Sequence, residues 1–178
     1  MRADAERNRA AILAVAGRLI CDDKLGNVSM DEIAAAAGVG KGTLFRRFTD
    51  REGLIRALFD DKTARAWATA HAQATDTTVP VAERILTYIA AVFDLTTVEL
   101  QPLTRAMPDG CNSDTWAPWR NQLTELIAQL DPDADAEFLT LALFSSMRPD
   151  LTDFVGTQRH RAGVLDLTAR VLGIAGPE

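Results

Sequence analysis

The sequence is poor in the residues that most often build metal centres and enzyme active sites. Its 178 residues include only 2 histidines and 2 cysteines. The histidines, His71 and His160, are far apart in the sequence and offer no ligand cluster for a metal ion. No nucleophile–base pair and no phosphate-binding loop is recognisable either. We therefore expect no catalytic residues, no metal site and no cofactor, and an enzyme is the weaker class of function.

The spacing of the cysteines and the lack of long apolar runs indicate the compartment. Cys21 and Cys111 are far apart, which does not favour a disulfide framework and fits a reducing environment. The first ten residues, MRADAERNRA, are polar and contain no apolar region of a signal peptide. No apolar run approaches the ~20 residues that cross a bilayer. We expect a cytoplasmic protein without a membrane partner.

Alternating runs of β-branched residues are missing too, so the sequence predicts an all-α fold. Apolar residues at helical spacing predict helices over about 4–22, 29–38, 41–48, 50–74, 81–99, 100–107, 114–130, 134–148 and 157–173. Thr49 followed by Glu52 forms a capping box that would open the helix at 50–74. We expect a small N-terminal domain, 1–50, and a larger helical domain, 51–178, connected by that helix.

Positive charge is concentrated in one short stretch of an acidic chain. The formal net charge is −6, which taken alone argues against nucleic acid as a partner. Residues 1–59, however, contain 10 Lys/Arg against 8 Asp/Glu. Residues 38–56 contain five basic side chains and only two acidic ones. A polyanionic partner would therefore meet this stretch rather than the rest of the chain.

Residues 29–48 combine the signals of two short helices joined by a tight turn. Ser29 and Glu32 form a capping box, and Gly38 can adopt the positive φ that the turn requires. Leu44 and Phe48 would hold the second helix against its neighbours. Three helices within about 45 residues, the last two joined at a glycine, are typical of the helix-turn-helix motif, whose last helix enters the DNA major groove.

The stretch SMDEIAAAAGVGKGTLFRRFTDREGLIRALF, residues 29–59, resembles the N-terminal DNA-binding module of the tetracycline-repressor-like (TetR) family of transcriptional regulators. The residues that match the family's pattern are Ile33, Ala34, Ala37, Gly38, Val39, Gly42, Thr43, Leu44, Phe48, Glu52 and Leu54. Gly40 and Phe45 depart from it, because a capping residue and a tyrosine are common there. Beyond residue 59 the resemblance is one of architecture only.

The resemblance implies double-stranded operator DNA as a partner. Lys41 and Thr43 are then the candidates for reading base edges, and Arg47 for a guanine or a phosphate. The other candidate DNA-binding residues are Ser29, Met30, Gly42, Phe45, Arg46 and Arg51, with Arg2, Arg7 and Arg9 as a basic arm. A solvated helical face that happens to carry several arginines is the alternative interpretation of the same cluster.

The resemblance also implies an unknown small-molecule effector, bound in a mostly apolar pocket among the middle helices. The candidate ligand-binding residues are Trp67, His71, Tyr88, Phe93, Met107, Trp116, Trp119 and Phe144. For each of them, ordinary packing in the hydrophobic core is the alternative interpretation.

The last two expected helices, 134–148 and 157–173, indicate a partner chain. The first is apolar nearly all round, and such a helix must be buried on every side. In the family, the corresponding helices of two subunits form a four-helix bundle, so the resemblance implies a homodimer. The candidate interface residues are Phe138, Leu141, Val164, Leu167 and Val171. A helix buried wholly inside its own domain is the alternative.

Together, the motif and the resemblance imply a ligand-responsive transcriptional regulator. The expected form is a repressor that binds a palindromic operator as a homodimer and is released by a small molecule. An activator, a regulator without a ligand and a helical protein-interaction adaptor are the alternatives.

Overall fold

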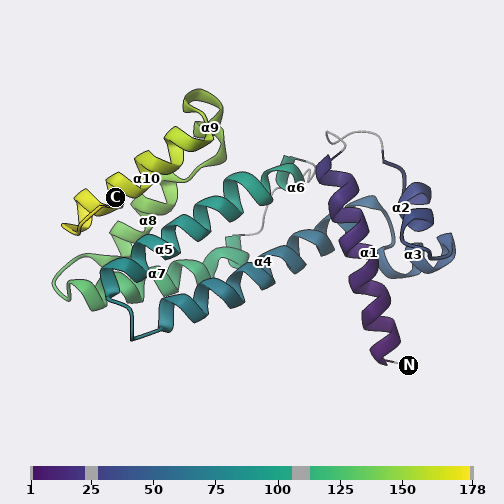
Figure 1. The fold of residues 1–178 in the computed structure, drawn as a ribbon, viewed down its shortest axis with the longest axis horizontal. Helices are drawn as coiled ribbons and strands as arrows, with labels where there is room; N and C mark the ends of the chain where they lie inside the picture. The colour runs from purple at the N-terminus through teal and green to yellow at the C-terminus, as the bar shows by residue number, and fades with distance from the viewer. Residues whose placement is uncertain (1, 23–27, 106–112, 177–178) are drawn as a thin grey trace. The chain divides into compact units, whose positions relative to one another are not determined.

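The computed structural model describes residues 2–22, 28–105 and 113–176, and within these ranges every regular element is a helix (Figure 1). The all-α prediction is confirmed. The chain divides into two compact units, residues 1–62 with 102–110 and residues 63–101 with 111–178. One long helix, α4 (Arg51–Thr75), contributes residues to both units. The domain boundary expected near residue 50 stays a prediction.

The first unit contains α1 (Arg2–Asp22), α2 (Met30–Ala36), α3 (Lys41–Phe48) and the first turns of α4. α2 packs against α1 and α3, and the Leu58 side chain of α4 lies close to Gly17 of α1. The side chains that face inward are apolar and recur at helical spacing: Ile12, Leu13, Ala16, Ile20, Ile33, Ala34, Leu44, Phe48, Leu54, Ile55, Leu58 and Phe59. This core fixes α3 with one face buried and the other exposed.

The turn between α2 and α3 has the geometry that the sequence predicts. Ser29 caps α2 and exchanges hydrogen bonds with Glu32, which confirms this capping box. Gly38 has a φ of +64°, where a Cβ atom would be strained. The amide of Val39 donates a hydrogen bond to the carbonyl oxygen of Ala34, at 3.0 Å. Gly40 occupies the N-cap of α3 and provides no side-chain hydrogen bond.

The junction between α3 and α4 corrects the second capping box. Thr49 does not cap α4; it ends α3, with a φ of 59° and a ψ of −57°. The cap is Asp50, whose Oδ1 accepts a hydrogen bond from the Gly53 amide at 2.8 Å. A Cβ atom on Gly53 would lie 2.2 Å from the carbonyl oxygen of Phe48. The chain can therefore make this close approach only with glycine.

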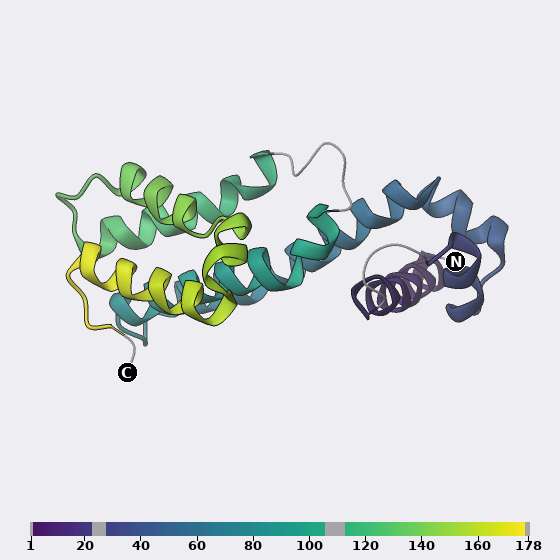
Figure 2. The same ribbon diagram turned by 90° about the horizontal axis from the view of Figure 1, so that it is seen from above.

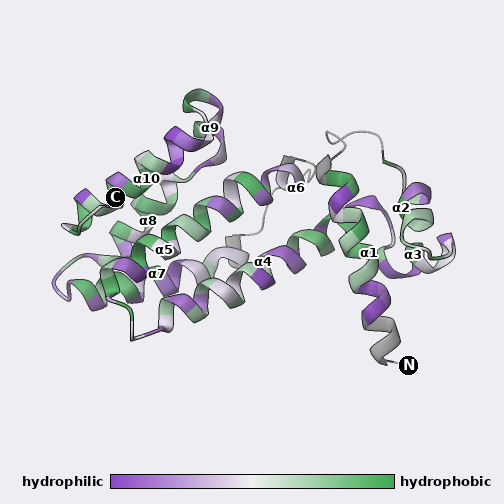
Figure 3. Ribbon diagram, viewed as in Figure 1, coloured by the Kyte–Doolittle hydropathy of each residue, from purple (hydrophilic) through white to green (hydrophobic). Residues whose placement is uncertain are grey.

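The second unit is a bundle of helices that pack against one another (Figure 2). Its elements are the rest of α4, α5 (Val81–Asp94), a π-helical turn η1 (Leu95–Glu99), a 3₁₀ turn η2 (Ser113–Trp116), α7 (Ala117–Leu130), α8 (Ala136–Ser146), α9 (Pro149–Val155) and α10 (Thr157–Leu172). The first residue of the short α6 (Gln101–Arg105) belongs to this unit, and the rest of α6 belongs to the first unit. Figure 3 shows mainly hydrophobic residues along α5 and α8, and α5 supplies much of the core.

Two arginines tie the helices of the second unit together. The buried guanidinium of Arg84 donates hydrogen bonds to the carbonyl oxygens of Ala74 and Val79, at 2.8 and 3.1 Å, and so closes the turn between α4 and α5. Arg161 of α10 makes a bidentate pair with Asp94 at the end of α5, at 2.8 and 3.0 Å. Bidentate geometry is the strong form of such pairs. α5 is therefore anchored at both of its ends.

The helix α9 is an element that the sequence analysis missed. No helix was expected between residues 148 and 157, but Pro149 is the first residue of a helix that continues to Val155. Proline is favoured at this position because the first amide of a helix needs no partner within it. The other expected helices are present, with ends that differ by a few residues.

Candidate nucleic-acid interface

The exposed side of α3 carries most of the residues expected to bind DNA. Leu44 and Phe48 are buried, which leaves Lys41, Arg46 and Arg47 exposed to solvent and Thr43 half-buried. Gly42 and Phe45 are exposed on the same helix. A cationic and exposed helix held rigidly by its buried face is the form in which a recognition helix enters a major groove.

The start of α2 and the start of α4 lie next to each other in this unit. The Nη1 atom of Arg51 donates a hydrogen bond to the carbonyl oxygen of Val28, at 3.1 Å, directly before the Ser29 cap. Ser29 is exposed and Met30 is half-buried. The structure thus brings together three of the residues expected to bind DNA, from the starts of two different helices.

The three cations of α3 differ in their hydrogen-bond partners. Lys41 forms an ion pair with Asp31 of α2, with 2.7 Å between Nζ and Oδ2. Arg46 folds back on its own helix, where it donates to the Gly42 carbonyl oxygen at 3.1 Å. Arg47 has no hydrogen-bond partner among the described residues. Asp31 was not singled out from the sequence, because nothing in the spacing of the two residues indicates the contact.

Acidic groups also contribute to the electrostatics of this surface. Hydrogen bonds from the backbone and side chain of Ser29 hold the pKa of the Glu32 carboxyl below its ordinary value. This carboxylate therefore stays ionised and keeps its hydrogen bonds to Ser29 at the start of α2. The basic residues expected as an N-terminal arm, Arg2, Arg7 and Arg9, belong to the helix α1.

The residues expected to bind a small molecule fall into several places in the second unit. Trp67, His71, Tyr88, Trp116 and Trp119 form one aromatic cluster from α4, α5, η2 and α7. Trp119 and Tyr88 are fully buried, and the Tyr88 hydroxyl donates to the Trp119 carbonyl oxygen at 2.9 Å. Burial raises the pKa of this hydroxyl. Both residues therefore lie in the hydrophobic core, and their assignment to a ligand site stays a prediction.

The rim of the aromatic cluster is more open and more polar. Trp67 is half-buried and stacks on the exposed ring of His71, with 5.0 Å between the ring centroids. The Nδ1 atom of His71 lies 2.6 Å from Oε1 of Gln122, so this nitrogen donates the hydrogen bond. Trp116 is also half-buried. The cluster thus combines buried aromatic rings, Tyr88 and Trp119, with the polar and exposed side chain of His71.

Three other expected ligand residues lie away from this cluster or outside the described ranges. Phe93 is buried and meets His160 of α10 edge-on, with 4.9 Å between the ring centroids. Phe144 is half-buried on α8. Met107 lies outside the described residues. The assignment of these residues to a ligand site stays a prediction.

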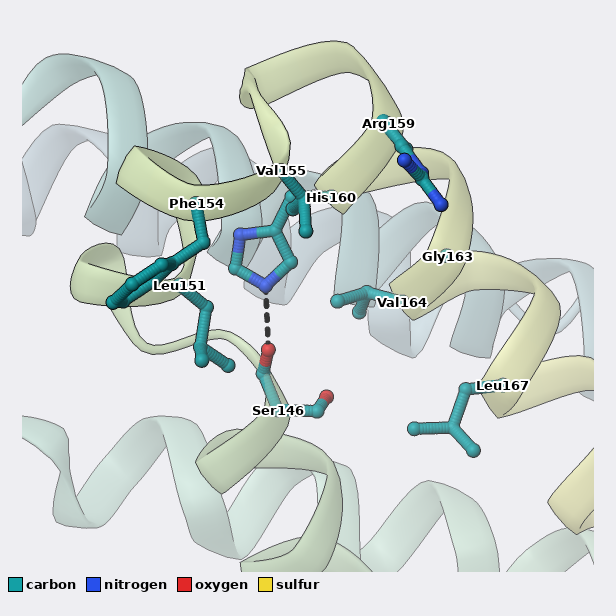
Figure 4. Close-up of a pocket in the computed structure, with 9 residues that line it drawn as sticks. All are labelled: Ser146, Leu151, Phe154, Val155, Arg159, His160, Gly163, Val164 and Leu167. Carbon is teal, nitrogen blue, oxygen red and sulfur yellow. Dashed lines mark hydrogen bonds between the residues drawn. The ribbon is translucent and has the colours of Figure 1, made fainter.

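A cavity of about 390 Å³ lies between the end of α8, α9 and α10 (Figure 4). Leu151, Phe154, Val155, Val164 and Leu167 give it an apolar wall. The buried ring of His160 also lines the cavity. Its Nε2 atom donates a hydrogen bond to the Ser146 carbonyl oxygen at 2.7 Å, and its Nδ1 atom accepts one from the Thr152 hydroxyl at 2.9 Å. None of the residues expected to bind a ligand lines this cavity.

Exposed apolar side chains are concentrated on α8, α9 and α10. Of nine large hydrophobic side chains that are exposed among the described residues, seven belong to these helices: Phe138, Leu141, Leu151, Phe154, Val155, Leu167 and Val171. Phe154 is the most exposed, at 85%. Val164, expected at a dimer interface, is only 3% exposed and faces its own unit. The other four expected interface residues are open to solvent.

Among the described residues no group of three or more histidine, cysteine, aspartate or glutamate side chains could hold a metal ion. The described helices include none with the length and apolar character needed to span a membrane.

Comparison with known sequences identifies the N-terminal module. Residues 12–58 match the family of bacterial regulatory proteins known as the tetR family. An HTH-type transcriptional regulator of Staphylococcus aureus (strain USA300) is 43% identical over 54 residues. That match covers 30% of this chain and 29% of the relative, so the similarity extends over less than a third of either protein.

Comparison with solved structures extends the similarity of the fold to the whole chain. A TetR-family transcriptional regulator from Pectobacterium atrosepticum has a TM-score of 0.74 and 22% identity, and the match covers 100% of both chains. The transcriptional regulator FadR from Bacillus subtilis, solved in complex with stearoyl-CoA, has a TM-score of 0.66 and 16% identity over 95% of this chain and 99% of FadR. Residues 12–58 therefore match the tetR-family model, and the chain as a whole shares its fold with these solved regulators.

Proposed function

We propose that this protein is a DNA-binding transcriptional regulator that reads its operator with α3. The observation that carries the proposal is the exposed cationic side of α3, whose apolar side is locked into the core of the tetR-family module. Lys41 and Thr43 lie on the first turn of α3, where side chains reach base edges. Arg47 extends from the last turn, and Arg51 with the Ser29 amide would hold the phosphate backbone.

A homodimer would place two copies of α3 on a palindromic site. The exposed apolar side chains of α8, α9 and α10 support it, because a patch of this kind usually marks an interaction surface. Phe138, Leu141, Leu167 and Val171 would form the centre of the contact. Phe154 and the cavity beside it extend the same apolar surface onto α9. In a two-fold dimer each copy would present this surface to the other.

We propose that the protein is a repressor, which blocks transcription while it is bound to DNA. A small molecule bound in the second unit would release it from the DNA. The aromatic cluster around Trp67, His71 and Trp119 supports this part of the proposal, because an apolar floor with a polar group is typical of ligand sites. FadR from Bacillus subtilis, which shares the fold, was solved with stearoyl-CoA. An acyl-CoA is therefore the first probe to test. All 3 tryptophans belong to the cluster, so quenching of intrinsic fluorescence would report binding there.

The experiment that tests the proposed function is selection of bound fragments from a random library of duplex DNA. We expect an enriched palindrome whose half-sites lie about one helical turn, roughly 10 base pairs, apart. Binding to the selected duplex should weaken steeply as salt rises, because each neutralised phosphate releases counterions. A library without any enriched sequence would contradict the proposal and favour an adaptor that uses α3 against an acidic protein.

A further inference from the structure

The ion pair between Lys41 and Asp31 has no counterpart on the other cations of α3. Asp31 lies in the first turn of α2 and Lys41 is the first residue of α3, so the pair links the two helices of the helix-turn-helix. The distance between Nζ and Oδ2 is 2.7 Å, a full charge-assisted contact. Both side chains remain largely exposed, at 63% and 59%. The pair therefore lies on the surface of the module and not in its core.

This ion pair contributes little to folding. An exposed pair gains little Coulomb energy in water and loses side-chain freedom when it forms. The two helices are held together without it, by the buried Ile33, Ala34, Leu44 and Phe48. The pair matters instead for the charge that the module presents, because the carboxylate neutralises one cation of α3.

The neighbouring acid, Glu32, cannot take the place of Asp31. Its carboxylate accepts hydrogen bonds from the Ser29 amide at 2.7 Å and from the Ser29 hydroxyl at 2.8 Å, and is thereby fixed at the cap. The ammonium of Lys41 also lies 6.0 Å from the centre of the Phe45 ring. Lys41 is thus held between an acid on α2 and a ring on its own helix.

We propose that Asp31 restrains Lys41 and thereby limits the affinity of the module for DNA. This inference rests on the proposed function, in which Lys41 contacts a base edge. DNA must displace the carboxylate before the ammonium can reach an acceptor on guanine, and the displaced carboxylate then stands near a polyanion. Asp31 is accordingly a restraining residue that acts through Lys41 and not a DNA contact itself.

The test is Asp31→Asn, which removes the charge and keeps the shape of the side chain. Binding to the duplex selected with the unmodified protein is measured by fluorescence anisotropy over a range of salt concentrations. We expect Asp31→Asn to bind about two- to fivefold more tightly, the upper part of the range that an exposed ion pair is worth. The plot of log affinity against log salt should become steeper by about one unit, since one more cation is available to phosphate or base.

A double-mutant cycle with Lys41→Gln separates the proposed restraint from a general effect of charge. In the Lys41→Gln background, Asp31→Asn should change affinity by less than about twofold. An equal gain in both backgrounds would overturn the proposal, because Asp31 would then act without Lys41. No gain in the unmodified background would overturn it as well.

Asp166→Asn is the matched control for net charge. Asp166 pairs with Arg170 on α10 at the same distance, 2.7 Å, and both side chains are exposed. We expect its DNA affinity to equal that of the unmodified protein, and a gain as large as that of Asp31→Asn would overturn the proposal. If the unmodified protein binds no duplex at all, the proposed function itself fails. If it binds and Asp31→Asn has no effect, only the restraint fails.

Discussion

At the scale of single residues, the junction between α3 and α4 depends on two backbone positions more than on any side-chain contact. Thr49 adopts a positive φ that a β-branched residue rarely tolerates, and the Asp50 amide bonds the Phe48 carbonyl oxygen across it. Gly53 lies against the same carbonyl group. This junction fixes the orientation of α3 relative to the core, so its backbone supports the surface that we propose binds DNA.

Gly53→Ala should destabilise the N-terminal unit. The new Cβ atom would stand 2.2 Å from the Phe48 carbonyl oxygen, and backbone atoms cannot yield as the end of a side chain can. We expect a loss of about 2–3 kcal/mol in the free energy of unfolding, as overpacking against fixed atoms typically costs. Urea unfolding followed by circular dichroism measures it. Gly42→Ala is the matched control, because a Cβ atom there meets nothing within 4 Å; an equal loss in the control would contradict this account of Gly53.

Thr49→Gly should stabilise the same unit. Glycine adopts the observed φ of 59° without a steric penalty, so the strain of roughly 1–3 kcal/mol is relieved, less about 1 kcal/mol for the greater freedom of the unfolded chain. We expect a net gain of about 1 kcal/mol by the same urea titration. A variant less stable than the unmodified protein would show that Thr49 makes contacts that outweigh its strain.

At the scale of elements, the sequence predicts where helices form better than it predicts which of their side chains are buried. The capping box of α2 and the turn at Gly38 were predictable, because each depends on residues only a few positions apart. The helix α9 was missed because Pro149 is as compatible with a bend as with the first residue of a helix. Val164 and Leu167 look alike in the sequence, but packing buries one and exposes the other. Such differences depend on contacts between distant segments.

The exposed apolar faces of α8 and α10 give the prediction at this scale. Replacing Phe138 and Leu141 together by Glu should convert the proposed dimer into monomers, because charges at the centre of an apolar interface would remain unpaired after desolvation. Sedimentation equilibrium measures the molar mass, which we expect to be about twice the chain mass of 19.3 kDa before the change and equal to it afterwards. Val98→Glu, at an exposed apolar position on η1, is the control and should leave the mass unchanged. A dimer that survives the double change would place the interface elsewhere.

At the scale of the whole molecule, the two units differ in how far the sequence alone could explain them. The N-terminal unit could be predicted to contain a helix-turn-helix, because a helix cap, a glycine turn, apolar core positions and positive charge all indicate this motif within about 30 residues. The second unit shares its fold with solved regulators at low identity, and its sequence carries no comparable motif. Its aromatic residues were divided between core and rim only by the structure, which buries Trp119 and leaves His71 exposed. The Asp31 contact with Lys41 likewise depends on how α2 and α3 pack.

The central claim is that α3 binds DNA, and the affinity of Lys41→Ala with Arg47→Ala for the selected duplex tests it most directly. Both side chains are exposed, so the free energy of unfolding should remain within about 0.5 kcal/mol of that of the unmodified protein, as measured by thermal unfolding. We expect the double variant to lose at least about 30-fold in affinity at fixed salt, since each lost base or phosphate contact costs about 1–3 kcal/mol. Retention of the original affinity by the folded double variant would contradict the assignment of α3 as the DNA-reading helix.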